Sequence, residues 1–505
     1  MTLLQLTGVK SQILTYLKKN RLESIVILMV FLIVSILRFW EIPNYMTFLG
    51  DEGRDALVLL NIFQDGKFTL LGPSASVGGF FLGPAYYYLV IPGFLLFGMS
   101  PVGMSFEVAL LGLISVIIFF WLTNKYLGFL SAITSTALYG VSPLIVTFSR
   151  SSWNPNIMPL LSISILALLL ISKEKQKLWL NIIIGGLFGL AIQSHYLGLI
   201  LALPIFITST VFWSKNIINL IKVYILTFIG FLITFSPFIL FELRHGFQNT
   251  TTIFDFITKP SGAVGVRELQ YSENIISAFS RLFKEVLSVS SKDFALVIAV
   301  SIFIFSLLSV IKFTSRNQRS FYFIILVWII SGVVGIGLYN GELYNYYFSF
   351  LFPLPFLLIS LVYFVFSHTQ IGQVLIVSIT LITISYLLPR NIIFQPQSNQ
   401  LKTAELVADK VIELAGGREY NFALMAQGNT DYAYRFFLEA KNTPPQPIEQ
   451  SITDQLIVVC EDKDCRYNLS PLPQILSFGP RKLDQEVDFI PGHIKIFRLV
   501  HEASK

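Results

Sequence analysis

Residues 24–40 read SIVILMVFLIVSILRFW, and about ten residues further on residues 50–55 read GDEGRD. The first stretch carries a single charge, Arg38, and is otherwise almost wholly apolar. A helix needs about 20 apolar residues to cross the ~30 Å hydrocarbon core of a bilayer. Residues 24–40 therefore predict a first membrane span, and the charged GDEGRD cluster follows just outside it.

The rest of the chain continues this apolar pattern for most of its length. It has 505 residues, of which 54% are hydrophobic and only 13% are charged, whereas soluble domains carry about 25% charged residues. The fold class predicted is a polytopic α-helical membrane protein with about eleven spans. We expect these spans at 24–40, 103–122, 127–148, 155–172, 178–195, 197–213, 218–241, 293–313, 320–338, 345–366 and 371–388.

The distribution of positive charges predicts the orientation, because cytoplasmic loops are enriched in lysine and arginine. The cations gather in residues 1–23 and in the loops that hold Lys125, Lys173/Lys175/Lys177, Lys215/Lys222 and Lys312/Arg316/Arg319. Because the N-terminal segment and the loop with Lys125 are both expected in the cytoplasm, the chain must cross the membrane an even number of times between them. The apolar stretch 84–99, interrupted by prolines, is therefore predicted to be a re-entrant or interfacial segment. The N-terminus is then inside and the C-terminus outside, with long outer loops at 41–102 and 242–292.

Residues 389–505 have an ordinary soluble composition, so we divide the chain into a cytoplasmic segment 1–23, a transmembrane domain 24–388 and an extracytoplasmic domain 389–505. The pattern of the last part predicts a small α/β domain. We expect helices at 401–415 and 431–440, and strands at 420–426, 455–460 and 493–499. Cys460 and Cys465 lie there, and a disulfide or two free thiols are both open. No basic stripe interleaved with aromatics is present, so nucleic acid is not an expected partner.

Asp51, Glu52 and Arg54 form the strongest candidate site. A carboxylate beside the bilayer can act as general base on an acceptor hydroxyl, and a guanidinium can neutralise a phosphate through paired hydrogen bonds. The alternative is structural: Asp51 would cap a helix over 53–63, with its neighbouring acids in the favourable first turn.

Further polar residues fall on the predicted outer side. Arg150 is a cation in a short outer loop, against the topology bias, and it precedes Asn154 and Asn156. It binds phosphate or reaches towards lipid head groups. For the other polar positions on this side, a role in substrate binding competes with two structural roles. These are a hydrogen bond to a neighbouring helix and a place in the aromatic belt at the membrane interface. These positions are His195, Arg244, His245, Tyr346 and Tyr347.

Residues 20–390 resemble the membrane glycosyltransferases of the C superfamily. The similarity is to bacterial relatives of the dolichyl-phosphate-mannose protein mannosyltransferases, including the aminoarabinose transferases of lipid A. It is carried by Asp51-Glu52-x-Arg54, the re-entrant stretch and the outer Ser-Arg loop. It implies a polyprenyl-phosphate sugar donor, chemistry on the outer face, the acidic role at Asp51 with Glu52 beside it, and a phosphate contact at Arg54. The family's second outer loop usually carries an acid, where this chain has Asn154 and Asn156, so a two-carboxylate metal site is in doubt.

The hypothesis is an inverting glycosyltransferase of the plasma membrane, with Asp51 as base and Arg54 stabilising the leaving phosphate. His195, Arg244, His245 and Arg150 are further candidates for phosphate binding, and Asn154, Asn156, Tyr346 and Tyr347 for the substrate cavity. No cofactor is required by the sequence, and a divalent metal is left open. The rivals are a transporter or polymerase of lipid-linked glycans and a noncatalytic relative. The sugar and the lipid, glycan or protein acceptor are not determined.

Overall fold

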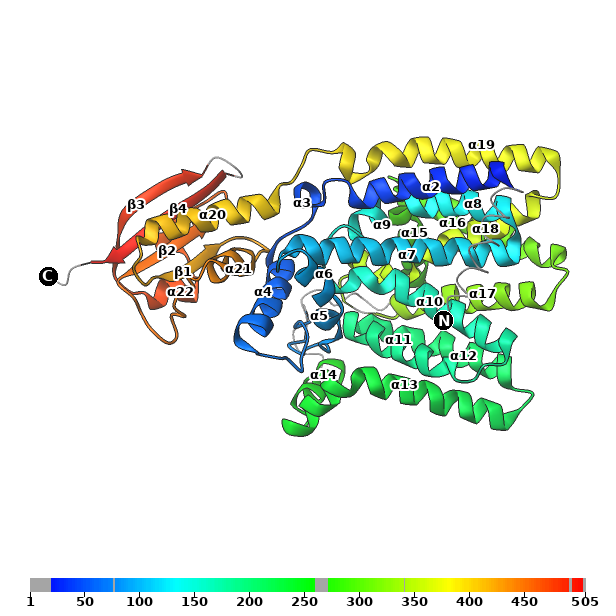
Figure 1. The fold of residues 1–505 in the computed structure, drawn as a ribbon, viewed down its shortest axis with the longest axis horizontal. Helices are drawn as coiled ribbons and strands as arrows, with labels where there is room; N and C mark the ends of the chain where they lie inside the picture. The colour runs from blue at the N-terminus through cyan, green and yellow to red at the C-terminus, as the bar shows by residue number, and fades with distance from the viewer. Residues whose placement is uncertain (1–19, 76–77, 259–270, 340, 490–492, 503–505) are drawn as a thin grey trace, which may run out of the picture.

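The computed structural model describes residues 20–75, 78–258, 271–339, 341–489 and 493–502. Most of the expected cytoplasmic segment, 1–19, and part of the second outer loop, 259–270, lie outside these residues. The chain forms a long helical bundle with a small α/β part at one end (Figure 1). This arrangement agrees with the predicted division between a membrane part and a C-terminal part, although the boundary near 389 and its placement outside the cell remain predictions.

Among the described residues, eight helical segments are long and apolar enough to cross a membrane. A ninth candidate is the bent pair η4 (Asn345–Leu351) and α18 (Pro353–Phe366), whose axes differ by 47°. The eight are α2 (Arg21–Phe39), α7 (Pro101–Leu127), η1–α10 (Asn154–Lys175), η2–α12 (Tyr196–Trp213), α13 (Ile217–Arg244), α16–η3 (Lys292–Lys312), α17 (Arg316–Gly337) and α19–η5 (Gln370–Arg390).

Two shorter apolar helices, α8 (Phe129–Val141) and α11 (Leu180–Ser194), occupy the positions of the two remaining expected spans. α8 stops early because Pro143 cannot continue it and instead opens the short helix α9 (Pro143–Phe148). The structure thus describes a multi-pass membrane protein. The total of eleven spans and the inside-to-outside orientation stay predictions.

The stretch 84–99 folds into two short helices, α5 (Ala85–Leu89) and α6 (Ile91–Leu96). α6 lies against α7, and the backbones touch so closely that a Cβ on Gly103 would come within 2.0 Å of the Gly93 carbonyl oxygen. Neither helix is long enough to span a bilayer. The loops predicted to lie outside also contain α4 (Gly50–Asp65), α14 (Gln248–Thr258) and α15 (Tyr271–Val286).

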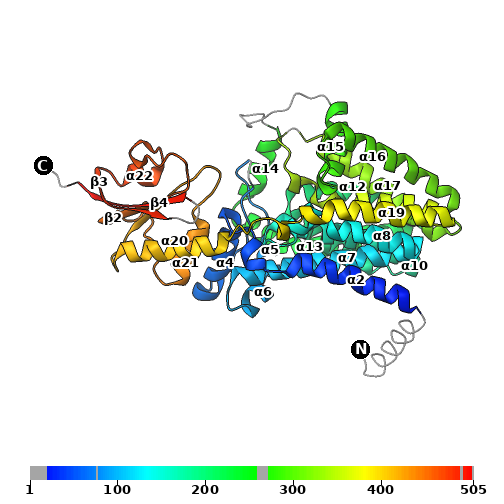
Figure 2. The ribbon, with the colours of Figure 1, turned by 90° about the horizontal axis from the view of Figure 1, so that it is seen from above.

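The C-terminal part is a four-stranded sheet in the order β1-β2-β4-β3. β1 (Asn421–Met425) and β2 (Gln455–Cys460) are parallel, while β4 (Ile494–His501) runs antiparallel to β2 and to β3 (Arg481–Phe489). α20 (Gln400–Ala415) and α21 (Tyr432–Ala440) lie on one face, and α22 (Pro473–Ser477) lies on the other (Figure 2). The expected helices and strands of this part are confirmed, and β3 is an additional strand.

β2 is the centre of this part, since all its residues are buried. Ile457 and Val459 face the helices α20 and α21, while Leu456 and Val458 pack with α22. At the end of β2, Cys460 is joined to Cys465 in a disulfide. Of the two alternatives for the cysteines, the structure therefore contains the bonded pair.

Helix α4 lies between the membrane bundle and the C-terminal part and touches both (Figure 1). The ring of Phe48, just before α4, packs at 6.0 and 5.8 Å from the rings of Phe436 and Phe437 on α21. The Phe48 backbone N–H also donates to the side-chain oxygen of Gln400 at 2.9 Å. The segment that carries the strongest candidate site is thus fixed by contacts with the C-terminal part.

Candidate active site

Helix α4 begins one turn earlier than the sequence predicts, at Gly50, so that Asp51 lies inside its first turn and not at the cap. The cap contact is made by Glu52, whose carboxylate accepts a hydrogen bond from the Leu49 N–H at 3.2 Å. Two acids in the first turn also complement the partial positive charge of the helix N-terminus. Glu52 is buried, at 7% exposure, and its contact is structural.

Arg54 lies between two carboxylates of the same helix. Its Nη1 is 2.6 Å from Asp51 Oδ1, while its Nε and Nη2 donate to Asp55 Oδ1 at 3.0 and 2.7 Å. The Asp55 side chain is completely buried, whereas that of Asp51 is 49% exposed. Asp55 therefore anchors the guanidinium from inside, and Asp51 presents its carboxylate to the outside.

Burial also changes the ionisation of the two inner acids. It raises the pKa of Asp55 to about 6, even though the charge of Arg54 lowers it. Burial likewise raises the pKa of Glu52 to about 7, against its hydrogen bonds to the backbone. Both groups thus titrate closer to neutral pH than ordinary carboxyls do.

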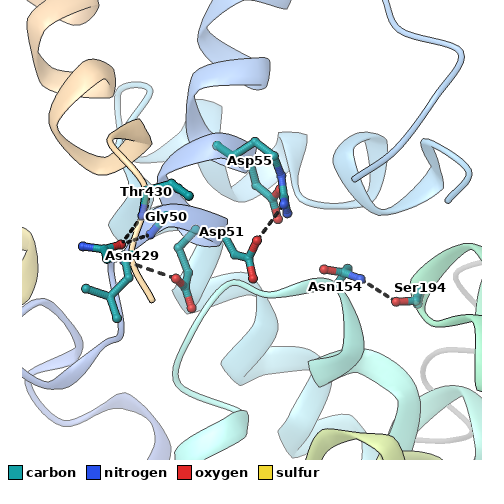
Figure 3. Close-up of polar contacts among 10 residues, drawn as sticks. Gly50, Asp51, Asp55, Asn154, Ser194, Asn429 and Thr430 are labelled. Carbon is teal, nitrogen blue, oxygen red and sulfur yellow. Dashed lines mark hydrogen bonds and ion pairs between the residues drawn. The ribbon is translucent and has the colours of Figure 1, made fainter. Parts of the chain in front are cut away.

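Asp51 and Arg54 line a cavity of about 380 Å³ that opens to solvent. The cavity gathers residues from α4, the loop between α4 and α5, the start of η1 with Trp153 before it, the α11–η2 junction and η4. Its lining residues are Asp51, Arg54, Pro73, Ser74, Ala75, Leu82, Trp153, Asn154, Pro155, His195, Tyr196 and Tyr346. Figure 3 shows Asp51 on α4 and Asn154, the first residue of η1. Five residues singled out from the sequence therefore meet in one cavity.

The wall opposite α4 is held rigidly by hydrogen bonds and rings. Asn154 donates through Nδ2 to the Ser194 carbonyl at 2.6 Å (Figure 3). His195 Nδ1 accepts from the Leu197 N–H at 3.2 Å, so in the neutral imidazole the proton is assigned to Nε2. The ring of Tyr346 lies 5.5 Å from His195 and 4.5 Å from Trp153. This wall offers a donor nitrogen and aromatic surface.

Arg150 lies away from the cavity, contrary to its expected phosphate contact. Its side chain is fully buried; Nη1 donates to the Leu37 carbonyl at 2.6 Å and Nη2 to the Trp40 carbonyl. The last carbonyls of a helix have no partners within that helix. At the end of α2 the guanidinium of Arg150 provides the missing hydrogen-bond donors. This role explains a cation in a short outer loop without any ligand.

The structure places the other expected residues outside the cavity wall. Arg244 and His245 are exposed at the end of α13, where the His245 ring stacks on Phe241 at 4.1 Å. Asn156 donates to the Ser151 carbonyl at 2.8 Å and so holds its own loop. Tyr347 is buried behind the wall, 4.9 Å from the His195 ring.

Asp55, which bonds Arg54, is a residue of this cluster to which the sequence gave no role beyond the first helical turn. Its signal was the spacing: Asp51 and Asp55 are four residues apart, so they lie on one face of a helix on either side of Arg54. Trp153 and Ser74 also line the cavity. No local pattern marks them, because their position depends on how distant loops pack.

A metal site was left open by the sequence. Within the described ranges, no group of three or more His, Cys, Asp and Glu side chains is arranged to hold a metal ion. Residues 149–156, which include Asn154 and Asn156, contain no carboxylate. The residues present do not fit a two-carboxylate metal site, so the chemistry below uses the side chains of the chain alone.

Comparisons with known proteins bear on the fold of the chain. The sequence profile of the dolichyl-phosphate-mannose-protein mannosyltransferase family matches residues 82–241. No curated protein is similar enough in sequence to be matched. A crystal structure of ArnT from Cupriavidus metallidurans in the apo state superposes with a TM-score of 0.59 at 13% identity, covering 96% of this chain and 98% of that one.

The same enzyme bound to undecaprenyl phosphate superposes with a TM-score of 0.60 at 12% identity, covering 95% and 98% of the two chains. This chain therefore shares the fold of ArnT. The resemblance expected from the sequence is thereby confirmed. The shared fold extends over the C-terminal sheet as well as the membrane bundle, since nearly the whole of each chain is covered.

Proposed function

We propose that this protein transfers a sugar from a polyprenyl-phosphate donor to an acceptor hydroxyl at the outer face of the plasma membrane. The observation that carries the proposal is the pairing, in one open cavity, of an exposed carboxylate, Asp51, with a guanidinium anchored from behind, Arg54. The match to a mannosyltransferase family profile and the fold shared with an ArnT that binds undecaprenyl phosphate support it.

In the proposed reaction Asp51 accepts the proton of the acceptor hydroxyl as its oxygen attacks the anomeric carbon. The new carbon–oxygen bond forms on the face opposite the phosphate, the bond to the phosphate oxygen breaks, and the configuration inverts. The polyprenyl phosphate leaves as a monoester and gains negative charge. Arg54 stabilises that charge at a site partly shielded from water.

The geometry of Arg54 suits this role. Its bonds to Asp51 and Asp55 use three of the five N–H groups that an arginine carries, and the Tyr87 hydroxyl also contacts the guanidinium. We propose that the other two bind the donor phosphate, and that the Asp51 contact loosens when they do. Asp55 keeps the guanidinium in place throughout. The Nε2–H of His195 is a second donor for the phosphate or the sugar.

The pH dependence of the reaction should report on Asp55. Above a pH of about 6 its carboxylate is ionised and holds Arg54; below that pH it is protonated and the ion pair is lost. We expect kcat/KM to fall as the pH is lowered from about 7 to about 6. The range extends above the pKa of Asp55 because Glu52, in the same helical turn, has a pKa of about 7 and the two titrations are coupled. Asp55→Asn should reduce activity and shift this acid limb. An acid limb identical to that of the wild type in the variant would contradict the assignment.

The experiment that tests the function uses purified protein in liposomes with a panel of polyprenyl-phosphate sugars, each labelled in the sugar. The proposal expects release of polyprenyl phosphate with at least one donor, increased by an acceptor that carries a hydroxyl group. Movement of intact labelled lipid across the bilayer without release would support a transporter and refute the proposal. No release with any donor and acceptor would also count against it.

A further inference from the structure

The N-terminus of α4 is held by a side chain from the C-terminal part of the protein. The backbone N–H of Gly50 donates to Asn429 Oδ1 at 2.9 Å, although the two residues are 379 positions apart in the sequence (Figure 3). The same oxygen accepts from the Thr430 N–H at 2.9 Å. Two donors directed at one atom fix which end of the Asn429 amide is the oxygen.

The other end of this amide is bonded as well. Asn429 Nδ2 donates to both carboxylate oxygens of Glu461, at 3.2 and 3.0 Å. Glu461 is held in turn by the Tyr434 hydroxyl at 2.5 Å and, through its own N–H, by the Met425 carbonyl at 2.8 Å. It directly follows Cys460, the disulfide-bonded end of the central strand β2. Asn429 is therefore oriented by a residue that adjoins the fully buried strand β2.

Close packing keeps α4 in contact with this amide. A Cβ on Gly50 would lie 2.1 Å from Thr430 Oγ1, and one on Gly53 would lie 2.4 Å from the Ala433 backbone nitrogen. Only glycine allows the helix to approach α21 and the turn before it so closely at these two positions. Asp51 follows Gly50 directly, and Arg54 follows Gly53. The two proposed reacting side chains thus adjoin the two points of closest contact.

The bond from Asn429 is not needed to form the helix. α4 has its own local cap, the contact between Glu52 and Leu49. The N–H of Gly50 belongs to the first turn, where backbone donors lack partners within the helix. An acceptor brought from another domain satisfies this donor and fixes where the first turn sits relative to that domain. It therefore determines position more than helix stability.

We propose that Asn429 is a positioning residue for Asp51, oriented by Glu461, so that the C-terminal domain completes the active site. This inference rests on the proposed function. It assigns to the domain a role in holding the first turn of α4 against the cavity, through the chain Glu461–Asn429–Gly50–Asp51. Displacing a reacting group by about 1 Å can cost about 100-fold in rate, so a single hydrogen bond at this point affects turnover.

The first test compares Asn429→Ala with Asn468→Ala, a control at an exposed asparagine of the same domain. Asn429→Ala should lower kcat by about 10- to 100-fold and leave the KM for the donor nearly unchanged, because Arg54 keeps its anchor on Asp55. The control should behave like the wild type. Wild-type kcat in Asn429→Ala would overturn the inference.

The second test asks whether orientation is the cause. Asn429→Asp keeps the acceptor for Gly50 but sets a carboxylate against Glu461, so kcat should fall by about 10-fold or more from like-charge repulsion. Adding Glu461→Gln restores the hydrogen bond in the opposite direction, because the new amide at position 461 donates to the new carboxylate at position 429. The double variant should return kcat to within about threefold of the wild type. A double variant no better than Asn429→Asp would overturn the inference.

A third measurement separates this inference from the proposed function. Amide hydrogen exchange over residues 50–54 should be faster in Asn429→Ala than in the wild type, with exchange in the remainder of α4 and in the sheet unchanged. If the wild type releases no polyprenyl phosphate, the proposed function fails, and this result still decides the role of Asn429. Unchanged exchange over residues 50–54 would overturn the inference.

Discussion

Asp51→Asn is expected to lower kcat by about 10²–10⁴-fold, because the amide keeps the size of the side chain but cannot accept the proton of the acceptor. Binding of the donor should change little, since Arg54 remains anchored by Asp55. The structure makes this variant more informative than the sequence does. Asp51 does not cap α4, so a loss of activity cannot be attributed to a lost cap.

The measurement is a single-turnover assay with the active donor, alongside a binding titration with polyprenyl phosphate. Asp65→Asn is the matched control, because it removes an exposed carboxylate from the other end of α4. Full activity in Asp51→Asn would remove Asp51 from the mechanism. Glu52 would not replace it readily, since its carboxylate is buried and bonded to Leu49.

Arg54 is expected to show a different pattern, with both weaker donor binding and slower turnover. Its charge opposes the phosphate in the ground state and the greater charge of the leaving group in the transition state. Arg54→Ala also leaves Asp55 buried without its partner, and breaking a buried pair can cost about 3–5 kcal/mol of stability. Arg54→Lys keeps the charge and is the cleaner variant. It should recover only part of the activity, because an ammonium cannot copy the bidentate fork.

The measurement for Arg54 is the pair of kcat and KM for the donor, with melting temperatures to separate misfolding from lost chemistry. Lys67→Ala, an exposed cation that pairs with Asp65 just after α4, is the control. Donor KM and kcat that both match the wild type in a folded Arg54→Lys would show that the guanidinium geometry is irrelevant. The same values in Arg54→Ala would exclude the residue from phosphate binding.

The sequence was sufficient for features that depend on local composition. Apolar runs of sufficient length predicted the helices of the bundle, and prolines predicted the interrupted stretch 84–99. The fully buried β2 was visible as an apolar run, whereas β3 was missed because most of its residues are exposed at the edge of the sheet. Asp51 and Arg54 were predicted as site residues because charged side chains beside a membrane span are costly and tend to be functional.

Features that depend on distant contacts were out of reach. Arg150 was assigned to phosphate from its position in a short loop, but its partners are carbonyls at least 110 residues earlier in the chain. Asn429 carries no motif at all, and only the folded structure brings it to Gly50. The early start of α4 also depends on long-range packing. Glycine is a poor helix former, so the sequence does not predict a helix that begins at Gly50. In the folded protein Thr430 packs so closely against Gly50 that no larger residue fits there.

The most direct test of the central claim is an experimental structure of the protein in lipid with polyprenyl phosphate bound. We expect the phosphate in the cavity formed by α4 and the loop before η1, with its oxygens within roughly 3 Å of the Arg54 guanidinium nitrogens. The isoprenoid chain should leave the cavity towards the membrane bundle, and Asp51 should face the side of the phosphate on which a sugar would be carried. A phosphate bound elsewhere, with Asp51 and Arg54 unchanged and unliganded, would contradict the account.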